Sequence, residues 1–407
     1  MLTPATGARG AALDAIRPEA ARAPESGIVE VFNYGRDRQG LTPLWVGEGD
    51  LPTPDFIRDA AKSSLDAGET FYTHQRGIPD LRAAIADYMR GVYGTPFADG
   101  GAFVPERFFA TIGGMHALQL AMRLTCGAGD EAIVPTPAWP NFQGALIAGG
   151  ASPVEVPMRL VPRGDHMSWT LDVERIADAV TERTRVLVIN SPSNPTGWTA
   201  TREELAAVLE LARARGLWIV ADEIYGRFVY ASERAPSFHD LIEEDDRVLF
   251  VQTMSKNWAM TGWRVGWLEA PPELGATIEN LIQYSTSGVA VFMQRAAAVA
   301  LRQGEGFIAE QRARAAASRE ALLTGLAATG RIEAARPDGA FYLFFSVAGH
   351  PDTRALALRL VDEAGVGLAP GSAFGAGGAP FLRLCYARDP REIAAVTERL
   401  ARWLARS

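Results

Sequence analysis

The lysines of this chain are the first residues whose chemistry stands out. Only Lys62 and Lys256 are lysine among 40 basic residues, and all the others are arginine. Arginine keeps its proton at any working pH, whereas a desolvated lysine can lose its proton and attack a carbonyl group. Lys62 lies in an amphipathic, charged run, whereas small, hydroxylic and aromatic residues surround Lys256. Lys256 is therefore the candidate for covalent chemistry.

Further polar groups follow short apolar runs that predict strands buried on both faces. These runs are residues 185–189, 217–221 and 247–251. Ligands of open α/β sheets bind at the carboxyl ends of the strands, so the side chains that follow the runs are expected at one edge. The amide of Asn194 follows the first run, and the carboxylate of Asp222 and the phenol of Tyr225 follow the second. The third run is followed by two hydroxyls and an amine, which belong to Thr253, Ser255 and Lys256.

A glycine pair provides a candidate anion site. Gly113 and Gly114 follow the apolar run 109–112 and open a predicted helix. Free backbone N–H groups and the helix dipole make such a helix start attractive to phosphate, although glycine pairs also serve tight turns. Arg264 follows Lys256 by eight residues and, with the nearby hydroxyls, completes a plausible phosphate pocket.

The elements that must position these groups alternate between strand and helix from about residue 110 to 270. Thr201 and Glu204 have capping-box spacing at the start of one predicted helix. The alternation predicts an α/β fold with a mainly parallel sheet. A long helix is expected from about residue 290, followed by a more antiparallel region. We predict a large domain over residues 47–290 and a small α+β domain over residues 291–407. Residues 1–46 are predicted to form an N-terminal arm and part of the small domain.

Composition excludes several classes of function. The 407 residues are 48% hydrophobic and carry a net charge of -8, which gives no basic field for nucleic acid. No apolar run reaches the roughly 20 residues of a membrane helix, and the N-terminus lacks an apolar signal core. Cys126 and Cys385 form no spacing pattern, so we expect reduced thiols and a cytosolic protein. The five histidines lack metal-ligand spacing, so no metal is expected.

The chain resembles the fold-type I, class I and II pyridoxal-phosphate (PLP) aminotransferases. The resemblance runs from Leu44 to Arg383. Three motifs carry it: Leu44-Trp-Val-Gly-Glu-Gly-Asp-Leu-Pro-Thr-Pro54, Asn194-Pro-Thr-Gly197, and Ser255-Lys256 with Gly262-Trp-Arg-Val-Gly266. It implies pyridoxal 5'-phosphate as cofactor, the PLP transferase fold with a seven-stranded large-domain sheet, and a homodimer with shared active sites.

The resemblance also implies a role for each matching residue. Three residues are expected to be catalytic. Lys256 would form an imine with the cofactor, Asp222 would pair with its pyridine nitrogen, and Tyr225 would donate to its phenolic oxygen. Asn194 shares that donor role, and Trp139 stacks on the ring. The phosphate would be held by Gly114, Met115, Thr253, Ser255 and Arg264, and by Tyr72 of the neighbouring subunit. Substrate would contact Gly47, Asn194 and Arg383, whose planar fork suits the α-carboxylate.

Each of these residues alone also has a purely structural explanation. Asp222 to Tyr225 could be a strand end and turn, and Asn194 to Gly197 a loop with turn chemistry. Trp139 could be ordinary core, Arg383 a solvated edge residue, and Tyr72 a cap at a helix junction. Their joint occurrence at neighbouring strand ends favours the site.

The expected reaction exchanges an amino group between an L-amino acid and a 2-oxo acid. Met115 stands where some aspartate-type relatives carry a lysine, which favours neutral or aromatic substrates, although Arg36, Arg38 or Arg76 could supply that charge. The same scaffold supports Cβ–S lyases and other enzymes that deprotonate Cα. A PLP-sensing regulator would need a DNA-binding domain, for which the residues before Gly47 are too few.

Overall fold

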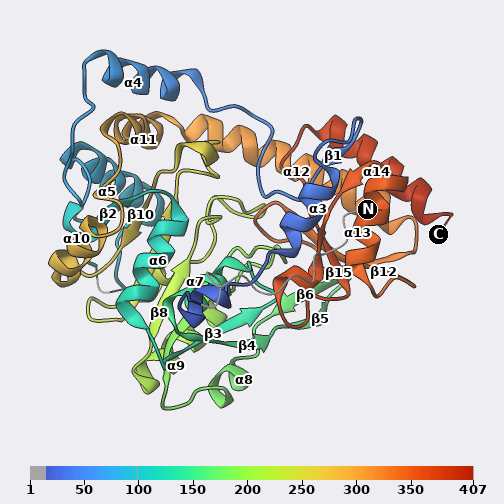
Figure 1. The fold of residues 1–407 in the computed structure, drawn as a ribbon, viewed down its shortest axis with the longest axis horizontal. Coiled ribbons are helices and arrows are strands. Elements are labelled where there is room, and N and C mark those ends of the chain that lie inside the picture. Colours follow the sequence, from blue (N-terminus) through green and yellow to red (C-terminus); the bar gives the residue numbers. More distant parts are fainter. Residues whose placement is uncertain (1–14, 99, 407) are drawn as a thin grey trace.

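The large sheet forms the centre of the molecule (Figure 1). The computed structural model describes residues 15–98 and 100–406. Within these residues the sheet has seven strands in the order β2-β10-β9-β8-β7-β3-β4. All neighbours are parallel except β10, which is antiparallel to β2 and β9. The strands are β2 (Phe108–Thr111), β3 (Glu131–Thr136), β4 (Ser152–Pro157), β7 (Thr184–Asn190), β8 (Trp218–Asp222), β9 (Val248–Thr253) and β10 (Gly266–Glu269).

Helices cover both faces of this sheet, which explains why its strands are continuous apolar runs. One face carries Val220, Leu249 and Leu268 and packs against α6, α7 and α10. The other face packs against α9 near its middle and against α5 and α11 near β2 and β10. The helices are α4 (Asp55–Asp66), α5 (Pro79–Tyr93), α6 (Gly114–Thr125), α7 (Asn141–Gly149), α8 (Val173–Asp178), α9 (Arg202–Arg215), α10 (Gly275–Gln283) and α11 (Val291–Gln303).

A smaller, antiparallel sheet forms the second layer system. Its order is β11-β12-β15-β14, and the N-terminal segment joins it through β1, which pairs in parallel with β13. The elements are α2 (Pro18–Ala21), α3 (Gly27–Gly35), β1 (Thr42–Pro43), β11 (Ile332–Ala334), β12 (Tyr342–Val347), α13 (Thr353–Glu363), β13 (Val366–Gly367), β14 (Ala369–Pro370), β15 (Phe381–Cys385) and α14 (Pro390–Leu404). A hairpin, β5 (Arg159–Arg163) with β6 (His166–Thr170), and five 3-10 turns complete the fold: Pro105–Arg107, Phe238–Asp240, Thr261–Trp263, Pro272–Leu274 and Gly371–Phe374.

The predicted fold class is confirmed, and so is the capping box of Thr201 and Glu204. The long helix expected from about residue 290 begins at Val291 as α11, but Gly304 interrupts it, and α12 (Glu305–Ala327) follows. A side chain at Gly304 would lie 2.4 Å from Trp258 Nε1, so this junction is tightly packed. The domain limits stay a prediction. Helix α11 packs against α4 and α5, whereas α12 packs against α14 (Figure 1). No described helix is both long and apolar enough to cross a membrane.

Candidate active site

One cavity collects nearly all the residues that the sequence singled out. It has a volume of about 410 Å³ and opens where the carboxyl ends of β7, β8 and β9 meet the N-terminus of α6 and the strand β15. Of the predicted site residues only Tyr72 is missing from its walls. The lining includes Gly47, Gly114, Met115, Trp139, Asn194, Asp222, Tyr225, Thr253, Ser255, Lys256, Arg264 and Arg383.

Lys256 projects into this cavity from the loop after β9. Its Nζ donates a hydrogen bond to the carbonyl oxygen of Gly47 at 2.7 Å. Burial lowers the pKa of the Lys256 amine to about 8, and the positive charges of Arg383 and Arg264 act in the same direction. A substantial share of the amine is therefore neutral at slightly alkaline pH, which is the form that can attack a carbonyl or accept a proton.

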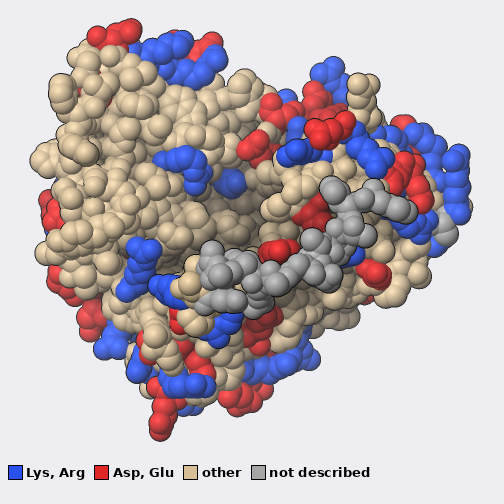
Figure 2. Space-filling model, in the orientation of Figure 1, with Lys and Arg blue, Asp and Glu red and all other residues tan. Residues whose placement is uncertain are grey.

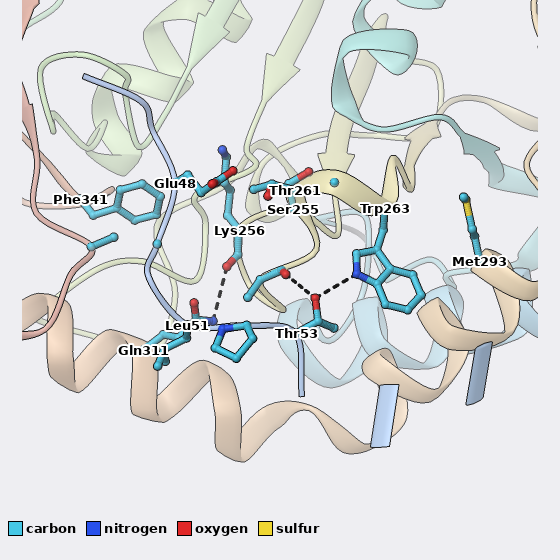
Figure 3. A pocket seen from close by; sticks show the side chains of 15 residues that line it. Glu48, Leu51, Thr53, Ser255, Lys256, Thr261, Trp263, Met293, Gln311 and Phe341 are labelled. Atoms are coloured by element: carbon cyan, nitrogen blue, oxygen red, sulfur yellow. Dashed lines mark hydrogen bonds between the residues drawn. The ribbon is translucent and has the colours of Figure 1, made fainter. Parts of the chain in front are cut away.

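A second cavity, of about 460 Å³, shares Ser255 and Lys256 with the first (Figure 3). Two contacts on its walls hold the lysine loop in place. Gln311 of α12 donates from Nε2 to the carbonyl oxygen of Asn257 at 2.8 Å. Thr53 accepts from Trp263 Nε1 at 2.9 Å and donates to the carbonyl oxygen of Ala259 at 2.6 Å. Segments from three parts of the chain thus fix the position of Lys256.

The start of α6 and Arg264 form a cradle for an anion. Gly113 has φ +86°, and a Cβ there would lie 2.5 Å from Arg264 Nη2, so only glycine allows the guanidinium this close to the helix start. Arg264 itself has φ 55°, an uncommon backbone conformation for a residue with a side chain. The first N–H groups of α6 have no acceptor within the helix. The positive φ angles of Gly113 and Arg264 thus occur beside the first N–H groups of α6, a combination that is typical of binding sites.

His116 supports this cradle, and the sequence analysis missed it. Its Nδ1 accepts from the backbone N–H of Ile112 at 3.3 Å, and its Nε2 lies 3.0 Å from Ser285 Oγ. Burial lowers the pKa of His116 to about 4, so the ring is neutral and can act as an acceptor. No sequence signal identifies this role, because Ser285 lies 169 residues away in the chain.

Asp222 ends β8 and is 2% exposed. Its carboxyl group accepts one long hydrogen bond, from the backbone N–H of Ile224 at 3.4 Å. Burial raises the pKa of Asp222 to about 7, and the charge of Glu223 adds to that rise. No salt bridge joins it to any described residue. A buried acid with so little compensation is expected where a cationic group of a ligand will lie.

Tyr225 lies beside Tyr342, a residue of β12 whose role the sequence analysis did not assign. Their hydroxyl oxygens are 2.7 Å apart. Burial, together with Tyr342, raises the pKa of Tyr225 well above its usual value, so the phenol stays protonated. The same Tyr342 hydroxyl explains Gly47, because a Cβ at that position would lie 2.0 Å from it. The strand pattern predicted β12, but no pattern connects residues 117 apart in the chain.

Arg383 is held rigidly at the small-sheet side of the cavity. Its Nη1 donates to Asn194 Oδ1 at 2.9 Å, its Nη2 bonds the carbonyl oxygen of Trp45, and its guanidinium lies over the ring of Tyr342. The residue is 3% exposed, and its Nε has no partner among the described residues. The structure therefore brings Arg383 and Asn194 together, with donor capacity left for a ligand.

The remaining walls are mostly apolar. Ile28, Val46, Met115 and Trp139 line the cavity, and Asn141 Nδ2 donates to the Met115 sulfur at 3.5 Å. Among the described residues the only basic side chains on the walls belong to Lys256, Arg264 and Arg383. The other candidate cations pair elsewhere: Arg36 with Asp37, Arg38 with Asp362 and Arg76 with Glu279.

Tyr72 points away from this cavity. Its side chain is 96% exposed, and it does not contribute to the walls. Within one chain it therefore has no contact with the predicted phosphate cradle.

Comparisons with known proteins agree with this geometry. Residues 41–400 match the family model described as aminotransferase class I and II. The chain is 34% identical to the aspartate/prephenate aminotransferase of Thermus thermophilus, over 97% of this chain and 98% of that protein. It is 30% identical to aromatic-amino-acid aminotransferase 2 of Thermococcus litoralis, over 93% and 95%. A solved mutant of Thermus thermophilus aspartate aminotransferase superposes with a TM-score of 0.86 at 33% identity, covering 95% of this chain and 99% of that one.

Proposed function

Because the chain belongs to the class I and II aminotransferases and is a transaminase, we propose that its cavity binds pyridoxal 5'-phosphate at Lys256. We propose further that it acts on L-amino acids with neutral or aromatic side chains and on the matching 2-oxo acids. The observation that carries the proposal is the arrangement of three groups in one cavity. A lysine with a lowered pKa, an almost unpaired buried acid and an anion cradle all face the same space.

The residues present fit this cofactor. The cradle of Gly113, Gly114 and Arg264 would hold the phosphate, with hydroxyls from Thr253 and Ser255 close by. Asp222 would pair with the pyridine nitrogen, whose positive charge would supply the compensation that this buried carboxyl lacks. Trp139 lies on the wall where a ring could stack, and Tyr225 and Asn194 supply donors for the phenolic oxygen.

When bound, the cofactor supplies an electron sink for bonds at the substrate Cα. The protein supplies the remaining functions. Arg383 binds the α-carboxylate and thereby fixes the orientation of the amino acid. Lys256 Nζ, in its neutral form, accepts the Cα proton as a general base. Tyr225 and Tyr342 remain protonated donors because burial raises the pKa of both phenols.

The apolar wall supports the assigned substrate class. A distal carboxylate on the substrate would face Ile28, Val46 and Met115, where burial of an unpaired charge is costly. A neutral or aromatic side chain would instead bury apolar surface there. The relatives named above include one that is named for aromatic amino acids.

We also propose a homodimer in which Tyr72 serves the second copy. Phe71, Tyr72 and Tyr284 are 82%, 96% and 86% exposed, and a hydrogen bond between Gln75 and Gln283 holds their two segments side by side. Figure 2 shows a face poor in charged side chains over the part of the molecule that carries α5 and α10 in Figure 1. Exposed apolar patches of this kind mark interaction surfaces. Sedimentation equilibrium tests the dimer, and a monomer at micromolar concentration would contradict it.

One spectroscopic experiment tests the function. The purified protein is loaded with pyridoxal 5'-phosphate and then mixed with single L-amino acids, without any 2-oxo acid. A cofactor band that converts stoichiometrically to the amine form and then stops supports the transaminase and ranks its substrates. A band that persists while ammonia and a 2-oxo acid accumulate would indicate a lyase. A preference for aspartate over phenylalanine and leucine would contradict the substrate class. The cytosolic location stays a prediction.

A further inference from the structure

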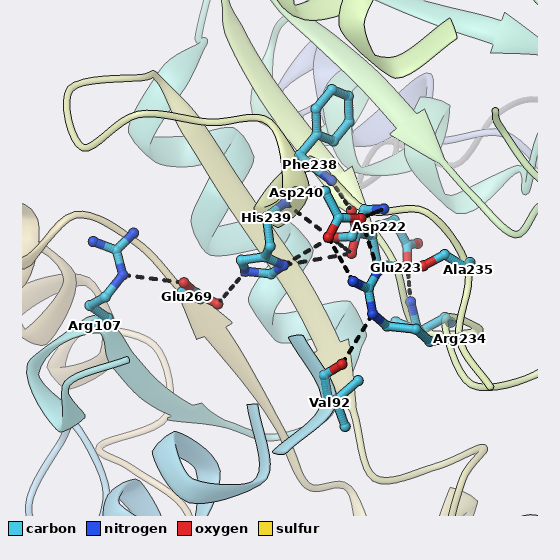
Figure 4. A network of polar contacts seen from close by, with 12 residues as sticks. Val92, Arg107, Asp222, Glu223, Arg234, Ala235, Phe238, His239, Asp240 and Glu269 are labelled. Atoms are coloured by element: carbon cyan, nitrogen blue, oxygen red, sulfur yellow. Dashed lines mark hydrogen bonds and ion pairs between the residues drawn. The ribbon is translucent and has the colours of Figure 1, made fainter. Parts of the chain in front are cut away.

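A row of buried polar side chains lies behind strand β8, and none of them lines either cavity around Lys256 (Figure 4). Each of its members is at most 5% exposed. The row connects the turn before β2 and the end of β10 with the residue that follows Asp222. Its members, from one end to the other, are Arg107, Glu269, His239, Ser237 and Glu223.

His239 lies at the centre of this row. Its Nε2 is 3.0 Å from Glu269 Oε2, and its ring stacks on Phe250 at 3.8 Å. Glu269 accepts a second hydrogen bond, from Arg107 Nε at 3.2 Å. Burial alone would raise the pKa of Glu269, but the charges of His239 and Arg107 outweigh it and lower the pKa. Glu269 is therefore a carboxylate, and His239 Nε2 carries a proton to donate to it.

Whether the other ring nitrogen of His239, Nδ1, carries a proton can be inferred from the single proton of the Ser237 hydroxyl. Ser237 Oγ donates to Glu223 Oε2 at 2.6 Å and accepts from the backbone N–H of His239 at 3.1 Å. His239 Nδ1 lies 2.9 Å from the same oxygen, and because the hydroxyl proton is directed to an ionised Glu223, we assign the proton of this contact to Nδ1. The ring therefore lies between the carboxyl groups of Glu269 and Glu223, and Ser237 bridges it to Glu223.

Glu223 connects this row to the cavity. It directly follows Asp222, and its negative charge raises the pKa of Asp222. Burial raises the pKa of Glu223 itself, whereas the charge of His239 and the Ser237 hydroxyl oppose that rise. Other charged groups nearby are already paired, since Arg234 binds Asp240 at 2.6 Å. Among the described residues, His239 is the basic group that lies beside the Glu223 carboxyl, with Nδ1 at 4.0 Å from Oε2.

We propose that His239 is a positioning residue for Asp222, a buried imidazolium that holds Glu223 through Ser237 and balances its charge behind the cavity. The effect on the cofactor rests on the proposed function, whereas the charge of His239 does not. In this arrangement the His239 ring is a fixed cation beside the Asp222–Glu223 pair, and the ring is not exposed to substrate. It keeps Glu223 from adding an uncompensated charge next to the carboxyl that meets the cofactor ring.

The first test uses the protein without cofactor. Nitrogen-15 labelling of its five histidines, with His239→Gln to assign the signal, reports directly on the ring nitrogens. We expect both His239 nitrogens to show the imidazolium shift at pH 7. A neutral-imidazole shift for His239 at pH 7 in the wild-type protein would overturn the proposal, whatever the enzyme does with PLP.

The second test uses the loaded protein. In His239→Gln the charge of Glu223 is no longer balanced, so a protonated cofactor is favoured and the pH midpoint of its absorption change should rise by about half a unit or more. Glu223→Gln in the same chain should bring the midpoint back, and the matched control His166→Gln should not move it. A lowered Tm with an unmoved midpoint would make His239 a purely structural residue and overturn the proposal. Absence of any cofactor band in the wild type would instead contradict the proposed function.

Discussion

Asp222 and Glu223 are consecutive acids with opposite surroundings. The carboxyl group of Asp222 faces the cavity with one long hydrogen bond from Ile224, whereas Glu223 faces the buried row and accepts from Ser237 and Phe238. The comparison extends to their neighbours. In the cavity Arg383 Nε has no partner within residues 15–98 and 100–406, whereas in the row Arg107 and His239 both bond Glu269. Unpaired buried groups mark the place of a ligand, and paired ones stabilise the fold.

The largest expected effect concerns the lysine of the cavity. Under the proposed function, Lys256→Ala would remove both the amine that attaches the cofactor and the general base, so turnover should fall by at least about 10⁴-fold. The same variant should unfold at nearly the same denaturant concentration as the wild type, because the Lys256 side chain makes a single hydrogen bond to the described residues, to the carbonyl oxygen of Gly47. Steady-state rates and urea unfolding measure the two quantities. Activity close to that of the wild type would exclude Lys256 from the chemistry.

Substitution in the buried row should lower the stability of the fold, unlike substitution of Lys256. Glu269→Gln leaves Arg107 and His239 without their shared carboxylate, and breaking a buried pair costs about 3–5 kcal/mol of the free energy of unfolding. Glu398→Gln, in an exposed pair with Arg402, is the matched control and should cost less than about 1 kcal/mol. Urea unfolding of the two variants distinguishes these values. Equal costs would mean that burial of the row is energetically unimportant.

Asp222 should destabilise the protein that lacks cofactor. Its folded pKa of about 7 exceeds the ordinary value of 3.8, so the folded state binds more protons between those values and stability falls as pH rises through that window. Above pH 7 the loss is complete and amounts to at most about 4 kcal/mol. Asp222→Asn should therefore be more stable than the wild type at pH 8, equally stable near pH 4, and weaker in binding cofactor.

Thermal unfolding at pH 4 and pH 8 measures this difference, with Asp37→Asn as an exposed control that should behave as the wild type does. An Asp222→Asn protein that is less stable than the wild type at pH 8 would show that the carboxyl is compensated after all. The contrast between Asp222 and Glu223 would then disappear.

The smallest expected effect concerns the substrate clamp. Under the proposed function, Arg383→Ala would remove charge-assisted hydrogen bonds to the α-carboxylate, so kcat/KM should fall by about 100-fold for amino acid and 2-oxo acid alike. Arg383→Lys, which keeps the charge and loses the fork, should recover only part of this loss. Steady-state kinetics with both substrates measure the effect. A loss confined to one of them would remove the assigned role.

The sequence predicts those features that depend on local pattern. Apolar runs located β7, β8 and β9, and the groups that follow them meet at one edge because parallel strands share a direction. A motif of neighbouring residues, such as Gly113 and Gly114, could likewise be assigned to the start of a helix. The resemblance to a known family supplied the individual roles.

Contacts between distant segments could not be predicted in the same way. Tyr342 meets Tyr225 only because the two sheets pack together, and His239 meets Glu269 only across neighbouring elements of the large domain. A histidine in the sequence looks the same whether it is a surface residue or a buried cation. The break at Gly304 was also missed, since an alanine-rich sequence predicts helix on both sides of it.

The scarcity of lysine makes the cavity addressable by amine chemistry. The Lys62 side chain is 68% exposed beside Asp59, whereas Lys256 is reached through the two cavities that it lines. In a Lys62→Arg background the only remaining side-chain amine is that of Lys256. An amine-selective label would then report occupancy of the site by mass alone, and an immobilised amine-reactive surface would leave the active-site lysine as the only side-chain point of attachment.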